Sequence, residues 1–395
     1  MTPAARIAAA IEILDRHLSG TPAEQALTGW ARGHRFAGSG DRAAIRDHVF
    51  DALRCRRSFA ALGGRAGRPT GRALMIGALR AAGTDPATVF TGEGHAPPPL
   101  TPDELRPDEM TDTEALDCPD WLAAPLRQSL GAGFAPVMEL LRHRAPVFLR
   151  VNLARIGRDA AQARLAAEGV ASEPHPLAGS ALRVTEGAAR LRRTAAYAEG
   201  LVELQDAASQ AVVEMLPLAD GQRVLDYCAG GGGKTLAMAA RARLDLCAHD
   251  AAPQRMADLP ARAARAGQRV TILAGADLPA RGPFDLVLLD VPCSGSGSWR
   301  RAPEGKWLLD RHRLAELLAL QARILDSAAP LVRPGGHLAY ATCSMLSAEN
   351  GAQVAAFLDR QADRQPGWQL VAQRDFTPLD GGDGFHGSVL RAPAA

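Results

Sequence analysis

The sequence predicts an α/β protein with a doubly wound, parallel sheet in its C-terminal half, an all-helical N-terminal domain and a small α+β insert. Three observations support this prediction. Apolar residues recur at helical spacing through the first 80 residues. From about residue 204, short apolar runs alternate with helical segments, which is typical of a parallel sheet covered on both faces. Between these regions, strand-like and helix-like segments occur without that regular alternation.

Residues 1–80 are predicted to form a helical domain that binds a polyanion. Ile7, Ile11 and Leu14 recur at helical spacing, and the segment 41–62 repeats the pattern. The region carries 13 arginines against six acidic residues. Residues 81–136, which are rich in proline and acids, are predicted to be a linker or an irregular region. The alternative for the basic residues is an ordinary solvated helical surface.

Composition bounds the class of protein. A chain of 395 residues has room for two or three domains, and no segment has the length and hydropathy of a membrane span or signal peptide. The six cysteines are scattered without a CxxC pair, which argues against a disulfide framework or a structural zinc site. We therefore expect a cytoplasmic protein with no metal and no membrane partner. Nothing in the sequence requires more than a monomer.

The remaining elements divide at about residue 205. Residues 137–205 are predicted to form the small α+β subdomain, with strands at 146–152 and 181–185 and a helix at 158–170. In the segment 206–395, the predicted strands are 223–228, 244–250, 269–273, 284–290 and 335–344, and the predicted helices are 206–216, 234–242, 253–267 and 313–331. Ligands of such a sheet bind at the carboxyl ends of its strands.

The stretch DYCAGGGGKT, residues 226–235, joins a predicted strand to a predicted helix. A P-loop would need glycine where Cys228 stands, and a dinucleotide-binding loop would need a third glycine at Thr235. The remaining interpretation is an S-adenosylmethionine loop, in which small residues let the backbone approach the ligand. Asp250 then follows the next strand, where an acid can bind a ribose diol. Asp277 follows the third strand and could reach the adenine edge.

Two cysteines follow predicted strands, in LLDVPCSGSG and in YATCSML. A buried cysteine usually serves as a small apolar residue, and this interpretation suits Cys55, Cys118 and Cys247. Cys293 and Cys343 differ because each lies at the edge of the sheet where a ligand is expected. A cysteine thiolate is a soft nucleophile, so these two residues are candidates for covalent catalysis.

Lysine is almost absent from the chain. Arginine supplies 43 of the 45 basic residues, and the only lysines, Lys234 and Lys306, stand in GGGGKT and EGKW. A compact ammonium differs from the planar arginine fork, which suggests that both sites need lysine. Chance placement is the alternative.

Several motifs together resemble the RsmB/Nop/Sun family of RNA cytosine-5 methyltransferases. They are LRVN, LVELQDAASQ, DYCAGGGGKT, LLDVPCSGSGSWRRAPEGKW, YATCSMLSAEN and GGDGF, and the paired PCSG and TCS motifs in this order are highly specific. The resemblance covers roughly residues 137–395. It implies a class I S-adenosylmethionine methyltransferase with a Rossmann-like, doubly wound seven-stranded sheet. The N-terminal helices resemble the NusB-like RNA-binding domain of bacterial members.

The resemblance also implies roles for individual residues. Cys343 is the thiol that attacks C6 of cytosine, and Cys293 assists adduct breakdown and product release. Asp290 holds the N3 and amino edge of the base, Lys234 pairs with Asp290, and Lys306 contacts RNA or the same acid. The cofactor-binding candidates are Cys228, Ala229, Gly230, Gly231, Gly232, Gly233, Lys234, Asp250, Arg255, Asp277 and Asp290. The RNA-binding candidates are Arg150, Arg300, Arg301 and Lys306, for each of which a solvated surface role is the alternative.

The chemistry of cytosine C5 methylation independently requires a nucleophile such as a thiolate. Carbon C5 of cytosine is a poor nucleophile toward a methyl sulfonium, and adding a thiolate to C6 turns the ring into a reactive enamine. Because a paired base hides both atoms, the target is expected to be single-stranded, looped or flipped out.

One position departs from the family pattern. The family's loop usually carries a proline where this chain has Gly231. Glycine can adopt the backbone angles of proline but does not enforce them. We therefore expect weaker or more mobile binding of the same cofactor.

The sequence thus predicts an S-adenosylmethionine-dependent RNA (cytosine-5) methyltransferase that acts on ribosomal RNA. The main alternative is a non-catalytic RNA-binding or ribosome-assembly factor on the same fold, against which the intact cysteines argue. A P-loop nucleotidase is a third interpretation, and the missing first glycine argues against it. The residues alone leave a DNA substrate open.

Overall fold

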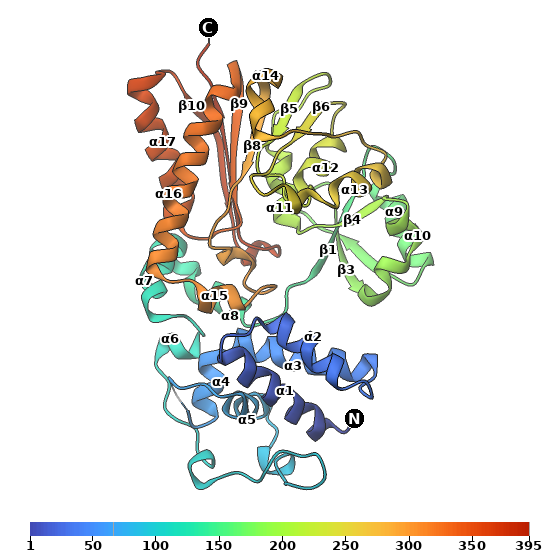
Figure 1. Cartoon of the computed structure of the whole chain (residues 1–395), viewed down its shortest axis with the longest axis vertical. Coiled ribbons are helices and arrows are strands. Elements are labelled where there is room, and N and C mark those ends of the chain that lie inside the picture. The colour runs from blue at the N-terminus through green and yellow to red at the C-terminus, as the bar shows by residue number, and fades with distance from the viewer. Residues whose placement is uncertain (66, 395) are drawn as a thin grey trace. The chain divides into compact units, whose positions relative to one another are not determined.

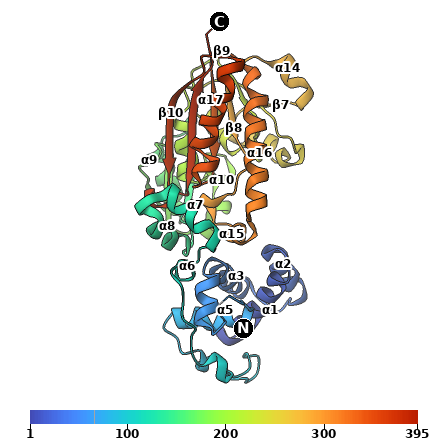
Figure 2. The ribbon, with the colours of Figure 1, turned by 90° about the vertical axis from the view of Figure 1, so that its left-hand side faces the viewer.

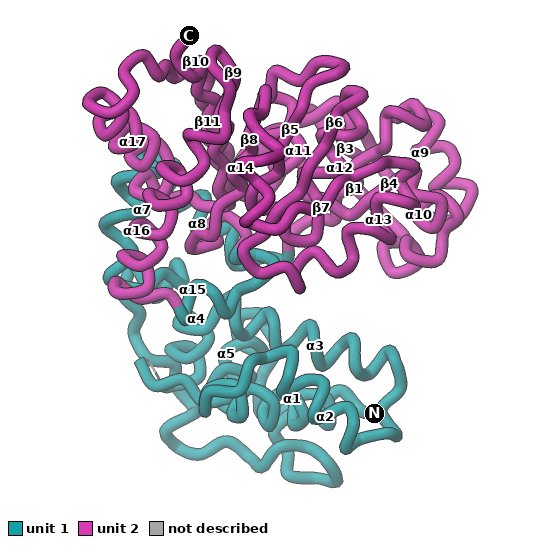
Figure 3. The backbone as a smooth tube through the Cα atoms, turned by 45° about the horizontal axis from the view of Figure 1, so that its top comes forward, with its two compact units in different colours: residues 1–144, 299–308 teal, residues 145–298, 309–395 magenta. Residues whose placement is uncertain are grey.

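The computed structural model describes residues 1–65 and 67–394. The chain divides into two units, which Figure 3 shows in different colours. The helical unit consists of residues 1–144 and 299–308, and the sheet unit consists of residues 145–298 and 309–395. In the described ranges, no helix is both long and apolar enough to cross a membrane.

Residues 1–80 are helical, as their apolar spacing predicts. Their helices are α1 (Pro3–Leu18), α2 (Ala23–Gly33), α3 (Ser39–Arg54), α4 (Arg56–Leu62) and the start of α5 (Gly71–Ala81) (Figure 1). Helix α1 begins where the Thr2 hydroxyl accepts the amide of Ala5, and Pro3 occupies its first position, where the missing N–H costs nothing. Its buried face, which includes Ile13 and Leu14, packs into a core completed by the other helices.

Residues 81–136, predicted to be an acidic linker, belong to the same helical unit. They contain α6 (Asp112–Ala115), α7 (Asp120–Leu130), the start of α8 (Phe134–Leu141) and single 3-10 turns at Pro86–Thr88, Pro102–Glu104 and Gly131–Gly133. Acids of this stretch pair with arginines of the first helices: Arg72 with Glu104 at 2.7 Å, and Arg57 with Asp120 at 2.7 Å. The opposite charges of the two regions are therefore partly neutralised inside one unit.

A short segment from the C-terminal half also belongs to the helical unit. It is residues 299–308, which include α15 (Glu304–Leu308). The side chain of Arg54 donates a hydrogen bond from Nε to the carbonyl of Arg300 at 2.8 Å, and the indole of Trp307 donates to the carbonyl of Leu53 at 2.7 Å. The predicted catalytic domain, residues 206–395, is therefore not continuous in sequence, because residues 299–308 fold with the helical unit.

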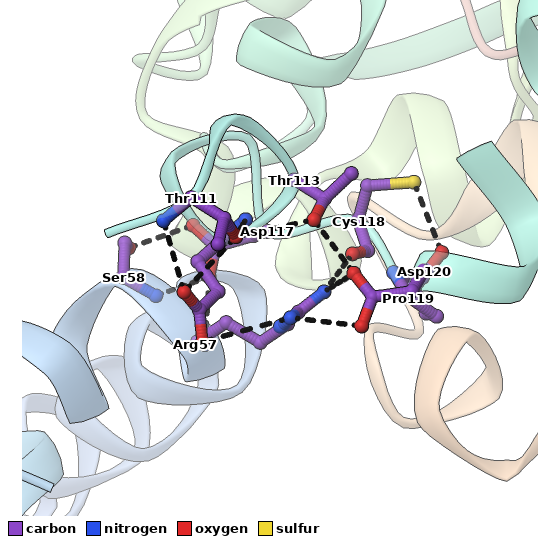
Figure 4. Close-up of polar contacts among 9 residues, drawn as sticks. Arg57, Ser58, Thr111, Thr113, Asp117, Cys118, Pro119 and Asp120 are labelled. Carbon is purple, nitrogen blue, oxygen red and sulfur yellow. Dashed lines mark hydrogen bonds and ion pairs between the residues drawn. The ribbon is translucent and has the colours of Figure 1, made fainter. Parts of the chain in front are cut away.

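A buried charged cluster lies within the helical unit. Asp117 has no exposed surface, and its carboxylate accepts hydrogen bonds from the backbone amides of Arg57 and Ser58 and from the Ser58 hydroxyl (Figure 4). The Nε of Arg142 donates to the same carboxylate at 3.0 Å. Burial lowers the pKa of Lys306 to about 8, and the negative charge of Asp117 opposes that shift. Asp117 therefore compensates the cations buried around it.

Replacing Asp117 by asparagine is expected to destabilise the protein by about 3 kcal/mol, because the buried cations lose their counter-charge. Asp120 is the matched control, since it binds Arg57 with 73% of its own side chain exposed. Asp120→Asn is expected to cost less than about 1 kcal/mol. Urea unfolding followed by circular dichroism measures both changes. Equal losses would contradict the role assigned to Asp117.

The sheet unit begins with a four-stranded antiparallel sheet in the order β2-β3-β1-β4. Its elements are β1 (Val147–Val151), α9 (Arg158–Ala167), β2 (Ala171–Pro174), β3 (Ala181–Glu186), α10 (Ala195–Ala198) and β4 (Val202–Leu204), with a 3-10 segment at Ala188–Arg193. Leu149 and Leu182 of the sheet pack against Leu165 of α9. The strands predicted at 146–152 and 181–185 and the helix predicted at 158–170 are confirmed.

The second sheet has seven strands in the order β10-β11-β9-β8-β5-β6-β7. They are β5 (Arg223–Asp226), β6 (Asp245–Ala248), β7 (Thr271–Ile272), β8 (Phe284–Asp290), β9 (Val332–Thr342), β10 (Gln369–Phe376) and β11 (Phe385–Arg391). The pairs among β5 to β9 are parallel, whereas β11 runs antiparallel to both of its neighbours. This is the predicted class I methyltransferase sheet. The strand order reverses between β5 and β8, which is where ligands of such sheets bind.

Helices cover both faces of the seven-stranded sheet (Figures 1 and 2). Helices α11 (Ala207–Glu214) and α12 (Gly233–Ala239) share a core with Leu286 and Leu288 of β8, and α13 (Leu259–Ala266) packs beside α12. Helices α14 (Leu278–Arg281), α16 (Arg311–Ala328) and α17 (Gly351–Arg364) pack with Val287 and Leu289 on the opposite face. The continuous apolar run of β8 follows from burial on both faces.

Candidate active site

The carboxyl ends of neighbouring parallel strands meet at one edge of the seven-stranded sheet. Strands β9, β8, β5 and β6 are adjacent in that order. The residues that follow them therefore gather at this edge: Cys343, Asp290 with Cys293, the glycine loop, and Asp250. Strand order thus assembles side chains that are far apart in the sequence.

The glycine loop between β5 and α12 needs glycine most clearly at one position. Gly232 has a φ of +79°, and a Cβ atom there would lie 2.2 Å from the Cδ1 atom of Leu259. Its amide donates to the carbonyl of Ala229 at 2.8 Å, which closes a tight turn. The loop therefore presents backbone, with little side chain, at the strand edge.

Side chains from neighbouring elements hold this loop. Asp250 accepts the amide of Gly230 at 2.9 Å, and Arg255, a predicted cofactor contact, forms an ion pair with Asp250 at 3.3 Å. Arg262 of α13 donates to the carbonyl of Gly231. Sequence reasoning missed Arg262, because its contact depends on how α13 packs against the loop and no motif marks it.

Arg150 of β1 also contacts the loop, and it is not open to RNA. It is 5% exposed, and its Nη1 donates to the carbonyl of Gly233 at 2.6 Å and to the side-chain oxygen of Gln205. Burial lowers the pKa of this guanidinium to about 10. The prediction that Arg150 binds RNA is therefore corrected: it ties the four-stranded sheet to the glycine loop.

Asp226, at the end of β5, offers a buried carboxylate that suits a cationic ligand. One of its oxygens accepts the Thr235 hydroxyl at 2.6 Å, and the other has no hydrogen-bond partner among the described residues. Burial raises the pKa of Asp226 to about 7. A nearby cation would favour its ionised form. S-adenosylmethionine carries an ammonium and a sulfonium, so it fits this acid beside a bare backbone loop.

The other predicted cofactor residues differ in surroundings. Cys228 and Ala229 lie within the loop, and burial raises the pKa of the Cys228 thiol far above its ordinary value, which suits a packing role. Asp277 ends the exposed 3-10 turn Gly275–Asp277 that follows β7. Its contact with an adenine edge remains a prediction.

Lys234 and Asp290 form the ion pair expected from the motifs. The Nζ atom of Lys234 lies 2.7 Å from Oδ2 of Asp290, and 33% of the Asp290 side chain remains exposed. The ring of Phe385, in the GGDGF motif, lies 4.8 Å from the same ammonium, at cation–π distance. Lys234 is thus held from two sides, while the carboxylate of Asp290 keeps an open face for a ligand.

The two candidate cysteines are in contact although 50 residues separate them in the chain. The Sγ atoms of Cys293 and Cys343 lie 3.4 Å apart. A hydrogen bond from Cys293 lowers the pKa of Cys343, and the Lys234 ammonium acts in the same direction. The same hydrogen bond, together with burial, raises the pKa of Cys293 well above its ordinary value. The pair therefore favours a thiolate on Cys343 with Cys293 as its donor.

The glycines that follow Cys293 allow two loops to touch. A Cβ atom on Gly297 would lie 1.9 Å from the carbonyl oxygen of Gly384, so no larger residue fits. The Gly297 amide donates to the carbonyl of Cys343 at 2.9 Å, and its own carbonyl accepts the amide of Gly384 at 2.9 Å. The glycine-rich stretch thus lets the two cysteine loops and the GGDGF motif contact one another through their backbones.

The remaining predicted RNA-binding residues belong to the helical unit. Lys306 is 1% exposed, and its Nζ donates to the carbonyl of Arg54 at 3.1 Å. Arg300 is also buried. The prediction that Lys306 contacts RNA is therefore corrected, because this side chain is buried within the helical unit, whereas an RNA contact of Arg300 remains a prediction. Arg301 is exposed and stays a candidate.

Two family models match the chain. Residues 213–378 match the model described as 16S rRNA methyltransferase RsmB/F, and residues 118–189 match the ferredoxin-like domain of RsmF/B-like methyltransferases. The chain belongs to the RsmB/F methyltransferase family. Its cofactor is S-adenosylmethionine, which fits the glycine loop and Asp226 as described above.

Two curated relatives of this RsmB/F family member carry the same name. The ribosomal RNA small subunit methyltransferase B of Erwinia tasmaniensis is 36% identical over 290 residues, covering 69% of this chain and 66% of that protein. The protein of the same name from Salmonella arizonae is 37% identical over 282 residues, covering 68% of this chain and 64% of that protein. The matched region thus spans slightly less than two thirds of each relative. The crystal structure of PH0851 covers 99% of both chains with a TM-score of 0.75 at 22% identity, which supports the fold.

Gly231→Pro is expected to tighten binding of S-adenosylmethionine two- to fivefold, corresponding to about 0.4–1 kcal/mol, because proline restricts the unbound loop. The contact with Arg262 uses the carbonyl of residue 231, which proline keeps. Isothermal titration calorimetry measures the affinity. Gly232→Ala is the control and is expected to weaken binding, since its φ is positive and its Cβ meets Leu259. Unchanged or weaker binding by Gly231→Pro would contradict the proposed effect.

Cys293→Ala is expected to raise the pKa of Cys343, because the hydrogen bond that stabilises its thiolate is lost. A higher pKa leaves less thiolate at a given pH, so alkylation of Cys343 by iodoacetamide should move to higher pH. Peptide mass spectrometry across a pH series measures the midpoint. Cys118→Ala, in the helical unit, is the control and should leave it unchanged. A midpoint that stays in place or falls in Cys293→Ala would refute the assignment.

Proposed function

We propose that this protein transfers a methyl group from S-adenosylmethionine to C5 of a cytosine in RNA through a covalent adduct with Cys343. The observation that carries the proposal is the thiol pair, in which Cys343 favours the thiolate and Cys293 lies 3.4 Å away. Methylation of an exocyclic amine or a hydroxyl needs no covalent nucleophile. Carbon C5 of cytosine does need one, since it is unreactive until C6 is attacked.

The first half of the reaction activates the base. The Cys343 thiolate forms a bond to C6, and the electron pair of the C5–C6 double bond becomes available at C5. S-adenosylmethionine, when bound, supplies an electrophilic methyl group. Asp290 holds the N3 and amino edge of the base, where charge develops as the adduct forms. Lys234 fixes the orientation of Asp290 through their 2.7 Å contact.

The second half releases the product. A base removes the C5 proton, the C5–C6 double bond re-forms, and the S–C6 bond breaks so that the electron pair returns to the Cys343 sulfur. We assign assistance in this step to Cys293, because its sulfur is in contact with that of Cys343. The same contact explains why two cysteines occur where one would suffice for attack.

Ribosomal RNA is the substrate class that we propose. Both curated relatives described above are named as ribosomal RNA small subunit methyltransferases, and we extend that substrate to this chain. The target cytosine must be unstacked, because pairing and stacking hide C5 and C6. Exposed arginines such as Arg301 are candidates for phosphate contacts. The proposed role also agrees with a cytoplasmic monomer, which remains a prediction.

Bisulfite sequencing of total RNA from cells with and without the protein tests this proposal. One cytosine of ribosomal RNA is expected to lose its methyl mark and to regain it with the wild-type chain but not with Cys343→Ala. Purified Cys293→Ala is expected to accumulate a protein–RNA adduct that denaturing electrophoresis detects, since breakdown is slowed. If Cys343→Ala restored the mark in cells that lack the protein, the covalent mechanism would be refuted. If no cytosine lost its mark without the protein, the result would favour the alternative function, a non-catalytic RNA-binding or ribosome-assembly factor.

A further inference from the structure

Each candidate cysteine is followed directly by a serine, in PCS and in TCS. Ser294 and Ser344 lie on different loops, and their hydroxyl oxygens are 3.2 Å apart. The carboxylate of Glu349, in the 3-10 turn Ser347–Glu349, accepts a hydrogen bond from each of these hydroxyls at its Oε2 atom. One acid thus binds the residue next to each thiol.

Further donors complete the surroundings of this acid. The backbone amide of Ser294 donates to Oε1 of Glu349 at 2.8 Å, and the side-chain amide of Gln321 donates to the same oxygen at 3.0 Å. Glu349 has no exposed surface. A buried carboxylate loses its hydration, and hydrogen bonds to neutral groups must compensate that loss. Such an acid has a specific structural task, because an apolar residue could fill the space at lower cost.

The position of Glu349 itself is fixed from strand β9. The hydroxyl of Tyr340 donates to the carbonyl of Glu349 at 2.7 Å. The next residue, Asn350, accepts from the Thr342 hydroxyl and donates to the carbonyl of Ser344 at 2.9 Å. The acid is therefore held by the strand that leads to Cys343, and it reaches across to the loop that carries Cys293.

We propose that Glu349 is a positioning residue that sets the spacing and orientation of the Cys293 and Cys343 thiols by clamping Ser294 to Ser344. The inference rests on the proposed function, in which both thiols act on one cytosine. Direct contacts between the loops help: the Met345 amide donates to the Ser296 hydroxyl at 2.8 Å. Ser296 also contacts both serines, since its amide donates to the Ser294 hydroxyl at 3.3 Å and its hydroxyl lies 3.1 Å from that of Ser344. Glu349 differs in that a single carboxylate oxygen accepts from both serine hydroxyls. Glu349 lies in YATCSMLSAEN, but the motif by itself assigned it no role, because its contact with the PCS loop depends on tertiary packing.

The clamp predicts effects on the chemical step and not on binding. Misplacing a reacting group by an ångström can cost about 100-fold in rate. Glu349→Ala is therefore expected to lower kcat about 100-fold, and Ser294→Ala and Ser344→Ala about tenfold each, with KM for RNA and for S-adenosylmethionine within about twofold of wild type. In the Glu349→Ala background the serine changes should add no more than about twofold, since their partner is already gone.

A second measurement reports thiol spacing without RNA or turnover. Phenylarsine oxide binds two neighbouring thiols at once, so its affinity depends on how the pair is held. The 395-residue chain is expected to bind one equivalent through Cys293 and Cys343, and Cys343→Ala is expected to lose this site. Glu349→Gln, which keeps size but loses charge, and the Ser294→Ala/Ser344→Ala double variant are expected to bind about tenfold more weakly. Ser388→Ala, a buried hydroxyl on β11, is the matched control and should bind like wild type.

The outcomes separate the clamp from the proposed function. If wild type methylates cytosine and Cys343→Ala does not, while the Glu349 variants keep both kcat and arsenical affinity, the clamp is refuted and the function stands. If wild type transfers no methyl group, the proposed function fails and the arsenical series still decides the clamp. If Glu349→Ala does not fold, Glu349→Gln and the two serine variants decide it by the same criteria.

Discussion

The parallel pairing of β8 with β5 and β9 is the constraint on which the candidate active site depends. Asp290 pairs in register with Ala341, so β8 ends beside the strand that leads to Cys343. A shift by one residue would exchange the two faces of β8 and move its apolar residues between cores. Burial of β8 on both faces prevents such a shift, because either core would lose its packing. The positions of Asp290, Cys293 and Cys343 follow from that register.

Beyond the strand ends, the site depends on loops that touch closely enough to share hydrogen bonds. Gly297 meets Gly384 backbone to backbone, and Ser294 and Ser344 are small enough to meet at Glu349. Covalent catalysis needs this rigidity, since the attacking and assisting groups must be held to within about half an ångström. The composition of PCSGSG and TCS therefore reflects contact between the loops as much as the chemistry of the thiols.

In the helical unit, several charged residues that the sequence suggested for RNA binding or for a linker instead form ion pairs within the fold. Its basic helices and acidic stretch look separate in the sequence, yet Arg72 binds Glu104 and Arg57 binds Asp120. Asp117 compensates buried cations in the same unit, including Lys306. Part of the charge asymmetry is thus neutralised within the fold, and exposed side chains such as Arg301 stay candidates for the proposed RNA contacts.

The sequence by itself determined the class of fold, the cofactor and the candidate chemistry. Alternation of strands and helices is a local pattern, and PCSG, TCS and the glycine loop mark strand ends without reference to the rest of the chain. Only the tertiary structure decided which basic residues face solvent. Arg150, Arg300 and Lys306 lie near motifs in the sequence, but packing buries all three. Arg262 lies in no quoted motif, and Glu349 lies in YATCSMLSAEN without an assigned role; the contacts of both arise from elements brought together over long distances in the chain. Periodicity specifies which face of an element is buried, whereas its partner depends on global packing.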